Sequence, residues 1–416
     1  MKAKEGKKNK VAVIGGGASG LVSAIAARHN GAEVTVLERL DRVGKKILAT
    51  GNGRCNLSNT DLDIAHYHGS NPKFAFGALS RFDFDQTMEF FARLGIAWKV
   101  EDGGKVFPVS NQASSVLDVL RFELDALGVA TRCDAEVKAI EPINGGFVLN
   151  LGDGGRFKAD RVILATGGKA APQLGANGSG YLLAQKLGHS IVEPFPALVQ
   201  LKLAADFLKQ ISGVKSIYAA ELQVEGKSLA RAEGEILFTD YGISGPPILA
   251  LSRTAGEHLR RDEQVLLRLN LINYLSRAEL DLLLRERLQQ QSHKTLAFSF
   301  VGLLNKRLIP VLLKEAGITE LQKPAGQVTA AERNAIIDIL QDWRFAVTGA
   351  NTWQQAQVTA GGIAVGEVNQ KTMASKLVPG LFLAGEVLDI DGDCGGYNLQ
   401  WAWSSGYVAG VSAATL

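Results

Sequence analysis

The sequence predicts an α/β fold in which a parallel-sheet domain is built from both ends of the chain, with β-rich and helical domains inserted between them. Near the N-terminus, the apolar runs Val11–Ile14 and Glu33–Leu37 flank a glycine turn and a helical pattern, which is the order of a βαβ unit. Near the C-terminus, Leu381–Ala384 is another short apolar run that ends at a glycine. Between these regions, alternating patterns give way to helical ones, and this change predicts the insertions.

The overall composition is typical of a water-soluble globular protein. The chain has 416 residues, of which 46% are hydrophobic and 21% are charged, and this length suits two or three domains. The net charge is only +3, and part of the basic excess lies in MKAKEGKKNK, which we expect to be a solvated tail. No basic stripe and no apolar run of about 20 residues occurs, so we expect neither a nucleic-acid partner nor a membrane span.

The spacing of cysteine and histidine argues against several kinds of site. Cys55, Cys133 and Cys394 lie far apart without a CxxC pair, which predicts reduced thiols and a cytoplasmic protein. The strand pattern begins at Val11 without a basic-then-apolar leader before it, which also favours the cytoplasm. The six histidines have no metal-ligand spacing, and HYH at 66–68 is interpreted as a loop, so no metal site is expected.

The first part of the parallel-sheet domain is expected to span 1–195. Its first helix is expected at Ala18–Arg28, and a long loop rich in Gly, Lys and Asn is expected over Asp41–Asn59. The remaining elements are two helices, an antiparallel β excursion and a buried strand, expected at Gln86–Leu94, Ser114–Leu127, 136–140, 146–151, 156–158 and Arg161–Ala165.

The inserted region is expected to contain two domains, a β-rich one over 196–270 and a helical one over 271–350. Two capping boxes predict helix starts in the helical domain, namely Ser276 with Glu279 and Thr329 with Glu332. The parallel-sheet domain is expected to resume over 351–416 and to end with a helix at Leu399–Ala413.

The glycine turn after the first strand has the spacing of a dinucleotide-binding loop. Gly15, Gly17 and Gly20 form a GxGxxG pattern between a buried strand and a helix. Gly15 permits the tight turn, Gly17 lets the backbone approach a pyrophosphate, and Gly20 lets helix and strand pack closely. Glu38 closes the next strand, where a carboxylate can accept hydrogen bonds from ribose hydroxyls. This pattern predicts a Rossmann-like domain that binds a dinucleotide at the helix start.

Two further segments favour FAD over NAD as that dinucleotide. RVILATGG at 161–168 resembles the second short motif of glutathione-reductase-type flavoproteins, in which a strand ends beside the dinucleotide. LFLAGE at 381–386 resembles their last FAD motif, in which a glycine and an acidic residue precede a helix that faces the flavin. Such a helix start can stabilise negative charge on the reduced isoalloxazine ring. We therefore expect an FAD-binding domain of the glutathione-reductase type.

Four longer segments carry a more specific resemblance. They are KKILATGNGRCNLSN at 45–59, FTDYGISGP at 238–246, VTAGGI at 358–363 and GEVLDIDGDCGGYNLQWAWSSG at 385–406. Together they are similar to one family of bacterial NAD(P)/FAD-dependent oxidoreductases, which includes aminoacetone oxidase and flavoproteins that reduce dehydro-bile-acid enones. The resemblance covers nearly the whole chain, and it implies an FAD domain in two pieces with inserted β-rich and helical domains.

The resemblance also implies which positions contact FAD. The expected contacts are Gly15, Gly16, Gly17, Ala18, Ser19, Gly20, Glu38, Arg39, Lys46, Gly53, Arg54, Cys55, Asn56, Val137, Thr166, Gly167, Gly168, Gly385, Glu386, Gly396, Tyr397, Asn398, Leu399 and Gln400.

No catalytic acid or base stands out in the sequence, and three residues are candidates. Tyr241 and Tyr397 can each donate the proton that reduction of an enone requires. Arg54 has two open interpretations. It is either a cation that lies near the flavin or near an anionic group of the substrate, or the partner in a salt bridge within its loop. Cys55 and Cys394 are possible redox thiols, but a cysteine without a near partner is more often a small packed residue.

These observations predict an FAD-dependent oxidoreductase that transfers hydride through N5 of the flavin. Reduction of an activated C=C bond in a small molecule is the favoured reaction. NAD(P)H is the expected donor and is expected to bind transiently, because the sequence has no second GxGxxG unit. Three alternatives stay open: an oxidase of a small amine that uses oxygen, a non-enzymatic FAD-binding protein, and a flavin-dependent tRNA-modifying enzyme with tight, salt-sensitive RNA binding. The sequence sets no oligomeric state.

Overall fold

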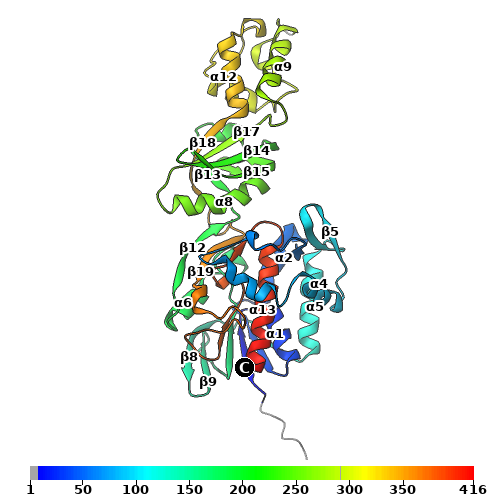
Figure 1. The fold of residues 1–416 in the computed structure, drawn as a ribbon, viewed down its shortest axis with the longest axis vertical. Coiled ribbons are helices and arrows are strands. Elements are labelled where there is room, and N and C mark those ends of the chain that lie inside the picture. Colours follow the sequence, from blue (N-terminus) through cyan, green and yellow to red (C-terminus); the bar gives the residue numbers. More distant parts are fainter. Residues whose placement is uncertain (1–7, 291) are drawn as a thin grey trace, which may run out of the picture. The chain divides into compact units, whose positions relative to one another are not determined.

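The computed structural model describes residues 8–290 and 292–416, and the chain divides into two compact units (Figure 1). Unit 1 ends at Pro196 and resumes at Ala356, and unit 2 is Ala197–Gln355. Residues 1–7 of the expected basic tail lie outside the described residues. Within the described ranges, no helix combines the length and the hydropathy that crossing a bilayer requires.

A five-stranded parallel sheet forms the centre of unit 1. Its strands are Lys10–Ile14 (β1), Glu33–Leu37 (β2), Ala130–Arg132 (β7), Arg161–Leu164 (β11) and Leu381–Leu383 (β20). The order is β20-β11-β1-β2-β7, so a strand from the C-terminal region completes a sheet that begins near the N-terminus. Ile14 pairs with both Leu37 and Leu164, so neighbouring strands end at one edge. The predicted α/β fold with a Rossmann-like domain from both chain ends is confirmed.

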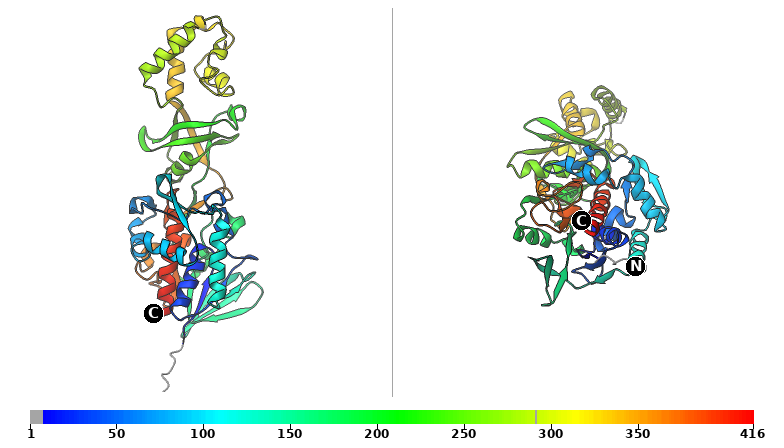
Figure 2. Two further views of the ribbon diagram at one scale, coloured as in Figure 1. Left: turned by 90° about the vertical axis from the view of Figure 1, so that its right-hand side faces the viewer. Right: turned by 60° about the horizontal axis from the view of Figure 1, so that its bottom comes forward.

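Two helices from distant parts of the sequence pack side by side in unit 1. They are α1 (Ala18–His29) and α13 (Tyr397–Thr415), which Figure 2 shows in dark blue and red. A Cβ atom on Gly406 would lie 2.4 Å from the carbonyl oxygen of Ser19, and Gly410 meets the next turn of α1 in the same way. Glycine is therefore needed at these positions for the two backbones to approach.

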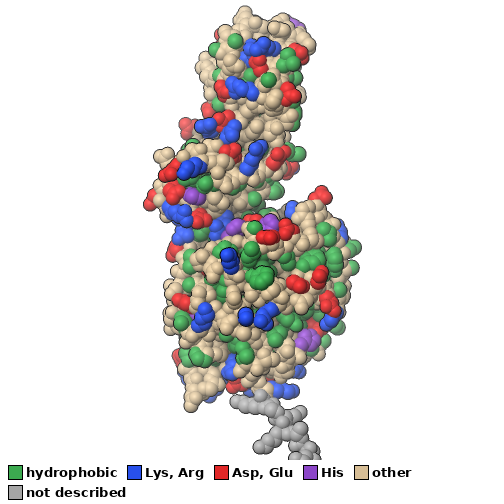
Figure 3. All heavy atoms as spheres, in the orientation of Figure 1, with side chains coloured by type: hydrophobic (Ala, Val, Ile, Leu, Met, Phe, Trp, Pro, Cys, Tyr) green, Lys and Arg blue, Asp and Glu red, His purple; other side chains and the backbone are tan. Residues whose placement is uncertain are grey.

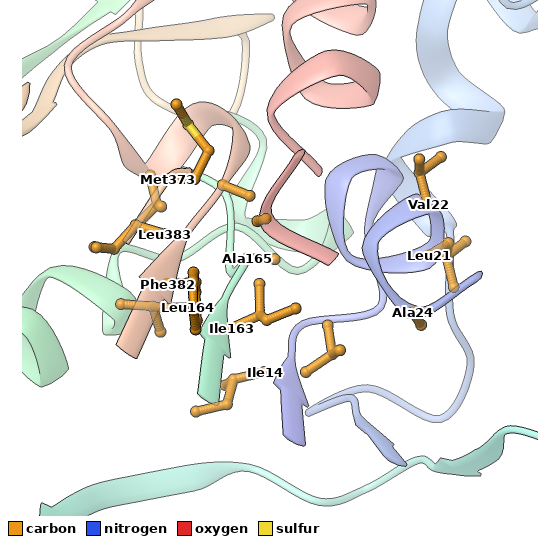
Figure 4. Close-up of a cluster of buried hydrophobic side chains, with 14 of the residues drawn as sticks. Ile14, Leu21, Val22, Ala24, Ile163, Leu164, Ala165, Met373, Phe382 and Leu383 are labelled. Atoms are coloured by element: carbon orange, nitrogen blue, oxygen red, sulfur yellow. The ribbon is translucent and has the colours of Figure 1, made fainter. Parts of the chain in front are cut away.

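The core of unit 1 joins the sheet to α1. Ile14, Ile163 and Phe382 come from three different strands, whereas Leu21 and Val22 come from α1, and all five side chains are buried (Figure 4). Full burial of an aliphatic side chain contributes about 1.5–3 kcal/mol to folding. The loops that leave the strand ends therefore start from a well-packed base.

Smaller elements surround this centre. The additional strands are Ser58–Asn59 (β3), Tyr67–His68 (β4), Trp98–Glu101 (β5), Lys105–Pro108 (β6), Val137–Ile143 (β8), Gly146–Leu151 (β9), Arg156–Ala159 (β10), Ile191–Ala197 (β12), Val358–Ile363 (β19) and Asp391–Gly392 (β21). They form the sheets β10-β9-β8 and β3-β6-β5 and the pairs β12-β19 and β21-β4. The helices are Lys45–Ala49 (α2), Phe76–Leu79 (α3), Phe84–Arg93 (α4), Ala113–Ala126 (α5) and Ser179–Lys186 (α6).

The segment Asp41–Asn59 and the start of α4 differ from the sequence-based expectation. The expected loop over Asp41–Asn59 contains α2 and a 3-10 turn at Thr50–Gly53. Helix α4 begins at Phe84, two residues earlier than expected, because the Asp83 carboxylate accepts the Gln86 N–H and caps the first turn.

Unit 2 is a closed β-barrel with helices in the connections between its strands. The barrel order is β13-β16-β15-β14-β17-β18, with strands Leu201–Leu203 (β13), Lys215–Val224 (β14), Lys227–Phe238 (β15), Gly242–Ser244 (β16), Val265–Asn270 (β17) and Trp343–Ala350 (β18). Its helices are Leu208–Ile211 (α7), Pro246–Leu259 (α8), Arg277–Gln290 (α9), Leu296–Ser299 (α10), Leu308–Glu315 (α11) and Ala330–Gln341 (α12). Helices α9 to α12 lie between β17 and β18 in the chain, whereas α7 and α8 connect earlier strands. Both predicted capping boxes are present, at the starts of α9 and α12.

The end of the predicted helical region is not helical. Trp343–Ala350 lies within the expected helical range 271–350, but it forms β18. This strand pairs with β17 on one side and β13 on the other, so it closes the barrel after the chain has made the helices. Its alternating buried and exposed residues are a strand pattern that the neighbouring capping box obscured.

Candidate active site

Glycines shape the loop between β1 and α1 in different ways. Gly15 has a φ of 105°, and a Cβ atom there would lie 2.5 Å from the Ala165 carbonyl oxygen, so the turn fits tightly against the end of β11. A Cβ atom on Gly20 would lie 1.9 Å from the Gly15 carbonyl oxygen. By contrast, a Cβ atom on Gly17 would meet nothing within 4 Å. Open space therefore lies at Gly17, where the sequence predicts the approach of a pyrophosphate.

The start of α1 has unused capacity for an anion. Gly17 caps the helix without a side-chain hydrogen bond, and the first turn contains no acidic residue. The first N–H groups of a helix have no partner within the helix, and the helix dipole adds positive charge there. Gly385, which follows β20, lies against this helix start, since its Cβ atom would be 2.4 Å from Ser19 Oγ. The first and last predicted FAD motifs therefore meet.

Glu38 braces the glycine loop from the end of β2. Its carboxylate is buried, and it accepts the Gly16 N–H at 2.7 Å and the Leu40 N–H at 2.9 Å. A carboxylate has about four acceptor sites, so these two bonds leave capacity for ribose hydroxyls.

Two other expected FAD contacts flank Glu38. The Arg39 side chain donates to the Gly175 carbonyl oxygen at 3.2 Å. Val137 is buried at the start of β8, two residues after Ala135, whose N–H donates to the Glu38 carbonyl oxygen at 2.8 Å. The structure therefore brings Glu38 and the β8 segment together at the same side of the sheet.

Lys46 and Glu386 come from separate motifs and form an ion pair, with Nζ and Oε2 2.7 Å apart. The other carboxylate oxygen of Glu386 accepts the Thr359 N–H at 2.8 Å. Thr359 Oγ1 in turn accepts the N–H groups of Lys169 and Ala170, at 2.8 and 2.9 Å. Thr359 lies in the VTAGGI segment but was not predicted as a site residue, because its role is to join backbone segments that are distant in sequence.

The start of α13 lies against the loop that follows α2. Gly395 and Gly396 have φ values of 150° and 105°, and a Cβ atom on Gly396 would lie 2.3 Å from the Ser58 carbonyl oxygen. Helix α13 begins at Tyr397 rather than at Leu399, because Gly396 adopts a left-handed cap that favours glycine. The first turn has no acidic residue and no side-chain cap. This helix start therefore also offers N–H groups and positive charge.

Asparagines hold the loop and the helix together. Asn59 Nδ2 donates to the Gly395 carbonyl oxygen at 3.0 Å. Asn56 Oδ1 accepts the Val106 N–H at 3.2 Å and lies beside Gly396. The segment around Asn56, in which FAD contacts are predicted, therefore reaches the start of α13.

Two expected FAD contacts use their side chains to hold α13. The Asn398 amide exchanges hydrogen bonds with the backbone of Gly392, at 2.9 and 2.6 Å. The Gln400 side chain is buried, where it accepts from Ser58 Oγ at 2.6 Å and donates to Thr87 Oγ1 at 2.8 Å. The side chain of Gln400 therefore points into the protein, and its backbone N–H donates to the Gly396 carbonyl oxygen at 3.0 Å.

Arg54 is engaged in a salt bridge. Its Nη1 atom lies 3.0 Å from both carboxylate oxygens of Glu101, and its guanidinium lies 3.9 Å from the centre of the Phe107 ring. Of the two interpretations of Arg54, this geometry matches the salt bridge between loop segments.

The cysteines and the second tyrosine candidate lie in different environments. Cys55 is buried, and this burial raises the pKa of its thiol to about 12. Cys394 is exposed, and all three cysteines are free. Tyr241 belongs to unit 2, in the exposed turn between β15 and β16.

Among residues 8–290 and 292–416, no group of three or more His, Cys, Asp and Glu is arranged for a metal ion.

A hydrogen-bonded cluster lies beside Tyr397. Asp393 accepts from His66 Nδ1 at 3.0 Å and from His68 Nε2 at 2.8 Å, and Asp61 lies 3.2 Å from His66 Nε2. The His66 and Tyr397 rings stack with their centres 4.3 Å apart. Figure 3 shows histidine side chains beside acidic ones on the drawn face of unit 1. Sequence analysis missed this cluster, because 325 residues separate His68 from Asp393.

A buried polar atom also points to a bound group near β11. The Tyr181 hydroxyl is buried without a hydrogen-bond partner in the described part of the chain, and it lies 3.0 Å from the position of a Cβ atom on Gly168. Gly180 of the same helix packs against Thr166 Oγ1. With two uncapped helix starts and the space at Gly17, these features fit FAD in this cradle.

The chain matches the family model described as HI0933-like protein Rossmann domain over residues 9–412. The chain belongs to this family. It is 41% identical over 408 residues to the 3-dehydro-bile acid delta(4,6)-reductase of Clostridium scindens, covering 98% of this chain and 99% of that relative. It is 30% identical over 397 residues to the ribosomal RNA dihydrouridine synthase of Escherichia coli, covering 95% of each.

A solved structure of 3-ketosteroid delta1-dehydrogenase from Sterolibacterium denitrificans shares the fold, with a TM-score of 0.50 and 12% identity over 98% of this chain and 99% of that one. The family resemblance that the sequence predicted is confirmed. The predicted class of protein is confirmed with it, and the chain is an FAD-dependent oxidoreductase of the HI0933-like family.

Proposed function

We propose that this chain reduces a C=C bond conjugated to a carbonyl group in a small apolar molecule, with NAD(P)H as the electron donor. The structural observation that carries the proposal is Tyr397 at the first position of α13, beside the segments in which FAD contacts are predicted. Saturating such a bond requires a hydride at one carbon and a proton at the other. When bound, FAD supplies the hydride through N5 of its isoalloxazine ring.

Tyr397 has the protonation state of a proton donor. Burial, and then the negative charges of Asp61 and Asp393, raise the pKa of Tyr397 to about 12. The phenol therefore keeps its proton at neutral pH and can donate it to a carbon or oxygen that becomes negative as hydride is added. The start of α13 adds N–H groups and positive charge, which stabilise negative charge beside it.

The names of two relatives support the same bond change. A delta(4,6)-reductase of a 3-dehydro-bile acid saturates bonds conjugated to a carbonyl group, and a dihydrouridine synthase saturates the pyrimidine double bond, which is also conjugated to a carbonyl group. A small apolar substrate is favoured over RNA, because identity to the bile-acid reductase is higher and the net charge is only +3. We expect NAD(P)H to bind only transiently, because the single GxGxxG unit of the sequence is assigned to FAD.

An anaerobic absorbance titration tests this function. The purified protein is titrated with NADH and then NADPH, and the reduced protein is mixed with a steroid 4,6-dien-3-one. The proposal expects bleaching of the flavin by one nucleotide, reoxidation by the dienone, and a product that has gained two hydrogen atoms by mass spectrometry.

Parallel mixtures separate the alternatives. Reoxidation by unmodified ribosomal RNA and not by the dienone would move the substrate class to RNA. A flavin that neither nucleotide reduces, but that small amines reduce and oxygen reoxidises, would replace the reductase with an amine oxidase. Bound flavin without turnover in any mixture would favour a non-enzymatic role.

A further inference from the structure

His66 lies between two carboxylates. Its Nδ1 atom is 3.0 Å from Asp393 Oδ2, and its Nε2 atom is 3.2 Å from Asp61 Oδ2. An ionised carboxylate only accepts hydrogen bonds, so both ring nitrogens must carry hydrogen for both bonds to form. The geometry therefore favours the imidazolium form of His66.

The same ring contacts the face of Tyr397. The two ring centres are 4.3 Å apart and the planes differ by 19°, so the rings stack. A cation above a tyrosine face is attracted to the π-electrons of that ring. Tyr67 packs edge-on against Tyr397, with ring centres 6.0 Å apart and planes at 86°. Tyr397 is therefore held by His66 on its face and by Tyr67 at an angle to it.

We propose that His66 is a positioning residue for Tyr397. As an imidazolium bound by Asp61 and Asp393, His66 holds the phenol ring at the start of α13, and it loses this hold when it gives up a proton. The role rests on the proposed function, because it acts through Tyr397 as the proton donor.

The groups that face His66 come from several elements. Asp61 belongs to the segment that precedes the 3-10 helix Ile64–His66, Asp393 follows β21, and Tyr397 begins α13. His68 shares the Asp393 carboxylate at 2.8 Å. The neighbouring 3-10 helix Pro72–Ala75 carries one charged residue, Lys73, which is exposed.

These surroundings set the direction of the pH dependence. Partial burial disfavours the charged form of His66, but hydrogen bonds to Asp393 and Asp61 outweigh it and raise the pKa of His66 above its ordinary value of 6.5. The interactions of the imidazolium are therefore fully present below pH 6.5 and are lost as the pH rises through the higher pKa of the folded protein. Side chains of the cluster reach the surface, so solvent can supply the proton.

Three variants test separately the positive charge of His66, its aromatic ring, and the contact of a histidine with the Asp393 carboxylate. His66→Arg keeps a cation that does not titrate near neutral pH, and His66→Phe keeps a ring without charge. His68→Gln is the matched control, because His68 binds the same Asp393 carboxylate but has no ring contact with Tyr397 in the described residues. Thermal unfolding and the absorbance of bound flavin establish that each variant is folded.

The pH profile of kcat is the first readout. Wild type and His68→Gln should lose activity as the pH rises through the pKa of His66. His66→Phe should lower kcat about tenfold at pH 6 with KM changed less than about twofold, since a cation–π contact and not substrate binding is lost. His66→Arg should restore kcat and remove the alkaline decline. A His66→Phe profile identical to that of wild type would overturn the proposal.

A second readout needs no substrate. In protein labelled with ¹³C in its histidine and tyrosine rings, the Tyr397 signal, assigned by its loss in Tyr397→Phe, should shift with the midpoint of His66. In His66→Arg, the Tyr397 signal should stay constant across that range. If the chemical shift of the Tyr397 signal does not change as His66 titrates, the positioning role is overturned. If no enone is reduced by wild type, the proposed function fails, and this coupling alone decides the role of His66.

Discussion

Lys46 Nζ lies 2.7 Å from Glu386 Oε2, although 340 positions separate the two residues in the sequence. Helix α2 supplies the lysine, and the segment after β20 supplies the carboxylate. The ion pair joins the two sequence pieces of unit 1, and Glu386 also accepts the Thr359 N–H from its own piece. About three quarters of each side chain in the ion pair is shielded from solvent.

Glu386→Gln should weaken FAD binding about tenfold and lower the melting temperature. Hydrogen bonds to charged groups contribute about 1.5–3 kcal/mol, and partial exposure of this pair reduces that value. Fluorescence titration of the apoprotein with FAD measures the affinity. Lys45→Met is the control, because Lys45 pairs with Asp41, whose side chain is much more exposed than that of Glu386, and its loss should leave affinity unchanged. Equal affinities in Glu386→Gln and wild type would remove Glu386 from the FAD site.

Two glycine substitutions should have opposite consequences. Gly17→Ala should fold, because φ of −83° suits alanine and its Cβ atom meets nothing within 4 Å, but the new methyl group should block FAD. Gly20→Ala should unfold the domain, because its Cβ atom would lie 1.9 Å from the Gly15 carbonyl oxygen. Thermal unfolding and FAD uptake of both purified proteins give the comparison. Uptake of FAD by Gly17→Ala with wild-type affinity contradicts the placement of the pyrophosphate.

Tyr397→Phe should lower kcat about 10²- to 10⁴-fold while FAD stays bound, since this is the usual contribution of a positioned acid. Tyr241→Phe, which removes the other candidate hydroxyl from an exposed turn of unit 2, should leave turnover close to that of wild type. Single-turnover reoxidation of the reduced flavin by the dienone measures the chemical step. The reverse ranking of the two variants would assign the acid to Tyr241.

Alkylation should distinguish Cys394 from Cys55. At pH 8, iodoacetamide should modify Cys394 much faster than Cys55. Burial raises the pKa of both thiols, to about 12 for Cys55, but only the Cys55 side chain is closed to the reagent. Peptide mass spectrometry of native and urea-unfolded protein locates the label, and Cys394→Ser serves as the control. Rapid labelling of Cys55 in the native protein would restore the redox interpretation of that thiol.

The local parts of the fold were predictable, because their signals lie within a few residues. Short-range geometry accounts for the GxGxxG turn, for the bounds of β2 at Glu33 and Leu37, and for the capping box at Thr329. The ion pair of Lys46 and the carboxylate shared by His66 and His68 were not predictable, since their partners lie more than 300 positions away. The same limit explains Gln400, whose buried hydrogen bonds depend on Ser58 and on the segment Phe82–Thr87, both more than 300 positions away.

The position of β20 and α13 in the chain affects the order in which the molecule can mature. A ribosome makes the strands of the barrel before it reaches Leu381. Unit 2 therefore has all its strands while the sheet of unit 1 still lacks its edge strand β20. The helix start at Tyr397 emerges later still. We expect cofactor loading to wait until both segments have emerged, and chains that stop before Leu381 should be substrates for cellular proteases, because the sheet of unit 1 then lacks β20.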